Sequence, residues 1–278
     1  MNDIIIHPTD FSECANSALN YAEELCLSLN AKLLLVHSID LNKLAGYEDS
    51  GHSLLNRSKE IEEEARSEIT KLGESIAKKG IQCKAKLYKG SLQQCLPTLI
   101  DEIQPRLVLM GTTGAGSLSN SIFGSTTYAI VQSSSAPVLA IPEFGEFSLC
   151  KNILLASDLS RSNFNYSILD YLSNLSKQIG ADLELLYVPD QSDSSAKLDD
   201  IKAKLNEKGH DGIEIEMAQG LDYINAIEEY LKGHDTDLFA MIISDKNVLE
   251  KFVFGSLSKK MIHHAKMPLM MIPRKLNY

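Results

Sequence analysis

The chain has 278 residues, 44% of them hydrophobic, and a formal net charge of −10 at pH 7. That length suits two domains of ordinary size rather than one, and the apolar content is enough to form a sizeable core. The acidic balance argues against a nucleic-acid partner, because binding to a phosphate backbone needs clusters of Lys and Arg that the sequence lacks.

The cysteines and the N-terminal residues both indicate the cytoplasm. Five cysteines are scattered along the chain without a CxxC pair, which is typical of reduced thiols rather than of a disulfide framework. The opening MNDIIIHPTDFSE has no basic stretch followed by a long apolar one, so no signal peptide is predicted. No apolar run approaches the roughly 20 residues of a membrane span. We therefore expect a cytoplasmic protein that does not bind membranes.

Short apolar runs alternate with helical patterns through the first half. Residues 3–8 and 32–39 are continuous apolar runs, typical of buried strands, and residues 12–30 between them carry apolar side chains at helical spacing. The alternation continues with a charged helix at 57–79, a strand at 83–90, a helix at 91–102, a strand at 106–111, a helix after a glycine-rich stretch, and a strand at 136–143. This order predicts an α/β fold with a parallel sheet and helices on both faces.

The same pattern then begins again at residue 151. Residues 151–172 repeat the first strand and helix, and later segments match the remaining strands in the same order: 181–190, 213–220, 237–244 and 267–274. We expect two copies of one α/β domain at 1–145 and 150–278, each with a five-stranded, mainly parallel sheet.

The segment GTTGAGSLSNSIFGSTT (111–127) joins a predicted buried strand to a helix. Parallel sheets bind ligands beyond the carboxyl ends of their strands, and glycines there let the backbone approach a phosphate. The next helix adds free N–H groups and a positive dipole end, and the hydroxyls of Ser125 and Thr126 can both cap it and bond phosphate oxygens. The GKS or GKT of a phosphate loop is missing, and Ser119 stands where GxGxxG requires glycine. The alternative interpretation is a plain turn.

The spacing within this segment matches a known signature. Gly111, two residues, Gly114, nine residues, Gly124 and then Ser125 form the nucleotide-binding pattern of the universal stress protein family, and the whole chain resembles two such domains in tandem. The stretches HPTDFSECANSAL, VHSID and SSSAPVLAIP are also similar to family landmarks. The resemblance implies two Rossmann-like domains of the adenine nucleotide alpha hydrolase-like type.

The resemblance also implies a site for ATP with Mg²⁺ in the first half. In ATP-binding members, the Asp after the first strand and the backbone at the end of the second strand hold adenine, while the glycine loop and the hydroxyls after it hold ribose and phosphates. The matching positions are Pro8, Thr9, Asp10, Ser38, Met110, Gly111, Thr113, Gly114, Gly124, Ser125 and Thr126. For Asp10, the alternative is a helix cap for the helix that begins near Ser12.

The second half departs from the signature. Asp158 and Gly255–Ser256 are kept, but Ser244 replaces the first signature glycine, no glycine matches the second, and the loop is two residues shorter. Bulky or acidic side chains occupy the rest of the loop: Val248, Leu249, Glu250 and Phe252. Without the glycines the backbone cannot approach a triphosphate closely, so we expect this half not to bind ATP and to be structural or to bind another ligand.

Two function classes fit these residues. One is a binding module, a nucleotide-sensing stress-response protein whose ATP occupancy alters its association with unknown protein partners. The other is a slow ATPase or phosphotransfer enzyme that uses the same pocket. The sequence supplies no evident general base, no GxSxG or HExxH motif and no histidine pair spaced for a metal, so we predict neither a catalytic residue nor a metal site. Binding is therefore favoured, and a scaffold without nucleotide is the third class.

The last strand of each half bears on assembly. Both strands are short and apolar, and an unpaired sheet edge is normally covered. The resemblance to the family implies a dimer in which the last strands of two subunits pair antiparallel. We therefore expect Val138–Ile141 and Leu269–Ile272 to pair in this way within one chain, as a pseudo-dimer. A homodimer of whole chains remains open.

Overall fold

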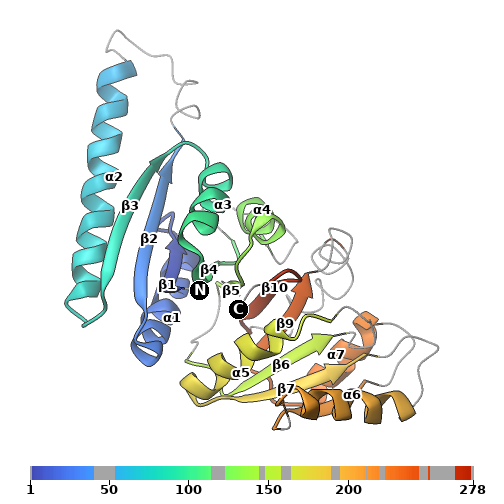
Figure 1. Ribbon diagram of the computed structural model, residues 1–278. Coiled ribbons are helices and arrows are strands. Elements are labelled where there is room, and N and C mark those ends of the chain that lie inside the picture. The colour runs from blue at the N-terminus through green and yellow to red at the C-terminus, as the bar shows by residue number, and fades with distance from the viewer. Residues whose placement is uncertain are drawn as a thin grey trace. The chain divides into compact units, whose positions relative to one another are not determined.

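The computed structural model describes residues 2–40, 54–113, 123–143, 148–157, 164–188, 195–210, 212–218, 223–243, 250 and 267–276. Among them, residues 2–113 and 124–143 belong to one compact unit and residues from 148 onward to a second, and each unit is coloured as a separate part of the gradient in Figure 1. The sequence-based domain limits, 1–145 and 150–278, remain predictions, because residues 144–147 near the predicted boundary lie outside the described residues.

The first unit is built on a sheet in which every strand pairing is parallel. Its strands are β1 (Asn2–Pro8), β2 (Lys32–Ile39), β3 (Cys83–Lys89), β4 (Pro105–Gly111) and β5 (Val138–Ile141). The pairings give the order β3-β2-β1-β4-β5. The direction of the order reverses between β1 and β4, and open α/β sheets bind ligands beyond the carboxyl ends of the strands at such a point.

Helices cover both faces of this sheet. They are α1 (Glu13–Leu29), α2 (Leu54–Ala77), α3 (Leu92–Ile103) and α4 (Ser125–Ser133). Right-handed crossovers place α1 and α2 on one face and α3 and α4 on the other. Consistent with this, Lys79 after α2 forms an ion pair of 2.5 Å with Glu23 of α1, and α3 packs on α4. The predicted strands and helices are confirmed, although α2 begins at Leu54 rather than at residue 57.

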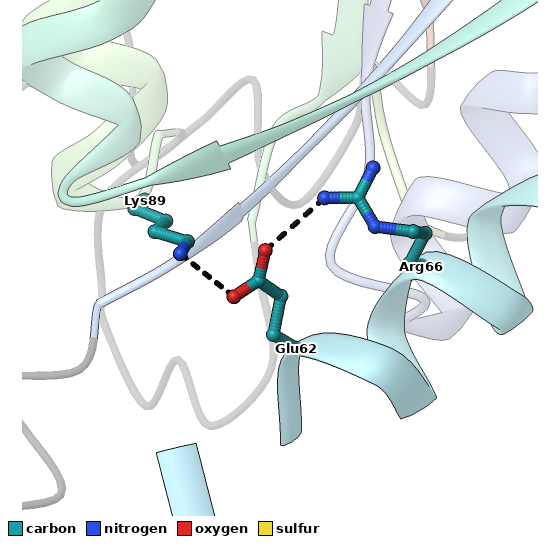
Figure 2. A network of polar contacts seen from close by, with 3 residues as sticks. All are labelled: Glu62, Arg66 and Lys89. Carbon is teal, nitrogen blue, oxygen red and sulfur yellow. Dashed lines mark hydrogen bonds and ion pairs between the residues drawn. The ribbon is translucent and has the colours of Figure 1, made fainter. Parts of the chain in front are cut away.

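The edge strand β3 is fixed to α2 by charged side chains. Glu62 of α2 accepts a hydrogen bond of 2.7 Å from Lys89, the last residue of β3, and one of 3.1 Å from Arg66 (Figure 2). Both partners lower the pKa of Glu62, Lys89 most strongly. Lysines on an edge strand oppose its pairing with other chains, and the ion pair of the exposed Lys89 with Glu62 links the end of this edge strand to α2.

The second unit repeats the first. Its strands are β6 (Asn152–Ser157), β7 (Asp182–Tyr187), β8 (Glu214–Met217), β9 (Leu238–Ile243) and β10 (Leu269–Pro273), in the parallel order β8-β7-β6-β9-β10. Its described helices are α5 (Ser167–Ile179), α6 (Ser195–Glu207) and α7 (Tyr223–Gly233). The predicted tandem of Rossmann-like folds is thus confirmed, whereas pairing of β5 with β10 stays a prediction. In the part of the chain that the structure describes, no helix is long and apolar enough to cross a bilayer.

None of the five cysteines forms a disulfide bond, and three of them, Cys14, Cys26 and Cys150, are buried. Burial raises the pKa of Cys26 to about 12 and that of Cys83 to about 11. Since only the thiolate is a good nucleophile or metal ligand, these side chains behave as small apolar groups near neutral pH.

Candidate functional site

Asp10 fixes the turn between β1 and α1. Its Oδ1 accepts hydrogen bonds from the backbone N–H of Ser12 (3.1 Å) and from the Ser12 hydroxyl (2.6 Å). Ser12 Oγ in turn accepts from the N–H of Ala15 (3.2 Å) and is the N-cap of α1. The interpretation of Asp10 as the helix cap is therefore wrong, because Ser12 has that role and Asp10 holds Ser12 in place. The exposed carboxylate of Asp10 lies at the carboxyl edge of the sheet.

β2 holds the same turn from the other side. The N–H of Thr9 donates to the Val36 carbonyl (2.9 Å), and the Thr9 carbonyl accepts from Nδ1 of His37 (2.7 Å). The His37 ring also packs on Phe11, with centroids 4.7 Å apart. Phe11 has a φ of 60°, which non-glycine residues rarely adopt, and its N–H donates to Thr9 Oγ1 (3.0 Å). His37, which precedes the predicted site residue Ser38, was not predicted as part of the site, and its ring holds the backbone of the predicted site residue Thr9.

His7 is a fully buried histidine just before this turn. Its Nδ1 lies 2.9 Å from the Leu109 carbonyl of β4. Successive N–H groups along a strand point to opposite sides, and the N–H of Thr9 points to β2. The N–H of residue 8 would therefore point to β4, but residue 8 is a proline and has no N–H. The His7 ring supplies the missing donor, so Nδ1 carries the proton. Nε2 has no hydrogen-bond partner among the described residues, and burial lowers the pKa of His7 to about 4.

Gly111 ends β4 directly against the first turn of α1. A Cβ at Gly111 would lie 2.7 Å from Sγ of Cys14 and 3.1 Å from the backbone carbonyl of Cys14. Helix α1 therefore excludes a side chain at this position, whether or not a ligand is near. The structure shows a packing reason for this glycine, whereas its predicted approach to a phosphate remains a prediction.

Backbone hydrogen bonds hold the start of α4 at the end of β4. The N–H of Gly124 donates to the Thr112 carbonyl (2.8 Å), and the N–H of Thr112 donates to the Ile141 carbonyl (2.9 Å). The buried hydroxyl of Thr127 donates to the Gly111 carbonyl (2.9 Å). Residues that are separated by the whole glycine-rich loop are thus fixed side by side, independently of residues 114–122, which lie outside the described residues.

The first turn of α4 has no side-chain cap. Gly124 is the N-cap, and the cap position makes no side-chain hydrogen bond among the described residues. Ser125 and Thr126 are the first two helical residues, so the predicted capping by their hydroxyls is wrong. The first N–H groups of a helix lack partners within the helix and carry its positive dipole end. With two hydroxyls beside them, these groups form a donor set that suits an anion.

A carboxylate contacts Thr113, one residue after the threonine whose carbonyl bonds the N-cap of α4. Glu143 follows β5, and its Oε2 accepts a hydrogen bond of 3.4 Å from the Thr113 hydroxyl. Both residues are half-buried. Glu143 was not among the predicted site residues. The available signal was an acidic residue at the end of the strand predicted at 136–143.

The structure brings most of the predicted site residues to one edge. They lie at the carboxyl ends of β1, β2 and β4 or at the start of α4: Pro8, Thr9, Asp10, Ser38, Met110, Gly111, Thr113, Gly124, Ser125 and Thr126. Gly114 lies outside the described residues. The second half was predicted not to bind ATP. Of the residues on which that prediction depends, the structure describes Glu250 alone, which is exposed.

Fold and site together define a Rossmann-like α/β protein in which a helix without a side-chain cap begins near the reversal of strand order. The sequence model of the universal stress protein family matches residues 1–142, and the chain belongs to that family. Two universal stress proteins of Methanocaldococcus jannaschii are similar to it. One is 24% identical over 150 residues, covering 49% of this chain and 93% of that protein. The other is 23% identical over 139 residues, covering 49% and 80%.

The resemblance in fold extends over both units. The crystal structure of a universal stress protein from Archaeoglobus fulgidus is similar with a TM-score of 0.76 and 18% identity, and the alignment covers 99% of each chain. At that identity the likeness concerns the fold alone. It supports the tandem arrangement, since a single family domain would match only one half.

Proposed function

We propose that the first unit binds one adenine nucleotide, ATP with Mg²⁺, and that the protein is a nucleotide-dependent stress-response module. The observation that carries the proposal is the uncapped first turn of α4, which backbone bonds hold at the end of β4. This turn ends the glycine segment whose spacing resembles the nucleotide-binding signature. An anion-accepting turn at the reversal point of a parallel sheet is the arrangement that open α/β folds use for phosphates.

The polar groups at both ends of the proposed site suit such a ligand. Asp10 presents an exposed carboxylate, an acceptor suited to the amino group of adenine, and Ser38 lies at the end of the neighbouring strand. Ser125 and Thr126 present hydroxyls and backbone N–H groups to the phosphates. Bound Mg²⁺ would supply positive charge to the polyphosphate. The unknown partners of the protein would then respond to whether the site is filled.

Calorimetric titration with ATP and Mg²⁺ is expected to give about one site per chain, because only the first half carries the complete signature. Ser125→Glu should abolish binding by placing a negative charge where the phosphates are proposed to lie. An acidic residue in the first turn of a helix stabilises it, so the loss would not come from unfolding. Ser133→Glu, at the other end of α4, is the matched control and should bind normally. Two equivalent sites per chain would contradict the proposal.

ATP is expected to outcompete GTP at this site by about ten- to a hundredfold, because guanine presents a carbonyl to the Asp10 carboxylate. Two facing acceptors cost roughly 1–3 kcal/mol. Asp10→Ala should erode the preference. Asp10→Asn keeps an oxygen for Ser12 and offers an amide N–H₂ to the guanine carbonyl, so it should shift the preference toward GTP. Competition binding measures both ratios, and equal affinities in the unaltered protein would remove Asp10 from the base site.

Slow hydrolysis or phosphotransfer in the same pocket is the second candidate. The observation that favours it is the carboxylate of Glu143 beside Thr113. Turnover with ATP in excess separates it from simple binding. Mass spectrometry of nucleotide released from the purified protein separates both from a scaffold that binds none.

A further inference from the structure

We propose that Glu143 holds the divalent cation of the bound nucleotide, so that Mg²⁺ strengthens ATP binding through this side chain. The inference rests on the proposed function and assigns a further residue to that site.

Three backbone and side-chain contacts place this carboxylate at the phosphate end. The N–H of Thr112 donates to the Ile141 carbonyl (2.9 Å), so the chain after β4 runs beside the chain after β5. One residue further along, the Thr113 hydroxyl donates to Glu143 Oε2 (3.4 Å). The Thr112 carbonyl accepts from the N–H of Gly124 (2.8 Å), the N-cap of α4. Two consecutive threonines therefore contact both elements: Thr112 bonds the N-cap of α4, and Thr113 makes a long hydrogen bond to the carboxylate.

The strand ends and turns that carry the proposed site residues contain no lysine or arginine that could balance a triphosphate. Residues 5–16, 36–40, 108–127 and 136–143 carry neither Lys nor Arg. Lys89, at the end of the edge strand, forms an ion pair with Glu62 instead. The N–H groups of α4 contribute only partial charges. A bound cation would supply the positive charge that these segments do not provide.

Glu143 has the properties of a ligand for that cation. It is half-buried, and among the described residues its side chain contacts a neutral hydroxyl and no basic group. Without a cation, this carboxylate would repel a polyphosphate. Mg²⁺ in nucleotide sites is held by one or two carboxylates together with the phosphates and water. A single carboxylate from the protein is therefore sufficient, and the same side chain changes from repelling to attracting the nucleotide when the metal is present.

The test compares ATP affinity in Mg²⁺ and in EDTA for the unaltered protein and for Glu143→Gln, by calorimetry. The unaltered protein should bind at least about tenfold more weakly in EDTA, since the carboxylate then repels the negatively charged polyphosphate. In Glu143→Gln this dependence on Mg²⁺ should fall several-fold, and in EDTA the variant should bind ATP more tightly than the unaltered protein. A residue with only a structural role would weaken binding in both conditions.

Two further variants keep the result interpretable. Glu102→Gln makes the same charge change on an exposed residue of α3, close to the start of β4 and hence at the opposite edge of the sheet, and should behave like the unaltered protein. Glu143→Asp retains the charge and should keep part of the Mg²⁺ dependence. If Glu143→Gln binds ATP with an unchanged dependence on Mg²⁺, the inference is overturned while the proposed function stands. If no form of the protein binds ATP in either condition, both are overturned.

Discussion

Acidification from pH 7 to pH 4 is expected to lower the free energy of unfolding of the first unit by about 2–3 kcal/mol through His7 alone. Burial lowers the pKa of His7 from its ordinary 6.5 to about 4 in the folded chain. As the pH falls below 6.5, the unfolded chain binds a proton that the folded chain does not, so stability decreases. The decrease ends near pH 4, where folded His7 is protonated as well. Urea unfolding curves measured at several pH values would show it.

His7→Asn is the matched control for this prediction. Asn Nδ2 occupies nearly the position of the imidazole Nδ1, so the variant can still donate to the Leu109 carbonyl while carrying no titratable group. The smaller side chain should lower stability at every pH, so the informative quantity is the slope of stability against pH between 6.5 and 4. All carboxylates are common to both proteins and cancel in the comparison. Parallel curves for the two proteins would show that His7 is not kept neutral by burial.

Gly111→Ala is expected to destabilise the first unit by about 1–3 kcal/mol, the range for overpacking a filled interior. The added methyl group would lie 2.7 Å from Cys14 Sγ and 3.1 Å from the Cys14 backbone, so relief requires α1 to move. Gly73→Ala, in the interior of α2, is the matched control. Its Cβ would lie 3.7 Å or more from every neighbour, so it should stabilise α2 by roughly 0.5–1 kcal/mol. Denaturant midpoints of the two variants should shift in opposite directions.

Destabilisation by both substitutions, or by neither, would refute this account of the two glycines. The contrast also bears on how binding is tested. A Gly111 variant that loses nucleotide could have lost the packing of α1 on β4 rather than a contact with phosphate. Ser125 is exposed and carries no such packing role, so it is the better position at which to probe the phosphate end.

Much of the fold could be predicted because its strands and helices carry clear periodic signals. β2 is a continuous apolar run and α1 has regular apolar spacing, and both were located to within a residue. The start of α2 was predicted at residue 57 rather than at Leu54, because the regular apolar spacing of this helix begins only at Ile61. α6 was not located because its buried positions, Ile201 and Leu205, stand among charged and polar residues.

The site was predictable only where it follows from spacing along the chain. The position of Asp10 after β1 follows from the motif, but its partner does not. Asp10 and Ser12 are both good cap residues, and the choice between them depends on where α1 begins. The contact of Glu143 with Thr113 joins residues 30 positions apart and exists only because β4 pairs with β5. The hydrogen bond of His7 Nδ1 likewise depends on the carbonyl of Leu109, far along the sequence.

The first turn of α1 serves both ends of the proposed site at once. Asp10 fixes Ser12, Ser12 caps the helix, and Cys14, two residues further on, lies against the glycine that ends β4. A ligand that displaced Asp10 at the proposed base end would therefore also displace the first turn of α1. That turn contacts Gly111 at the end of β4, where the segment leading to the proposed phosphate end begins. If the proposed site is correct, we expect the binding of the base and the binding of the phosphates to depend on the same helix turn, so that their free energies are coupled.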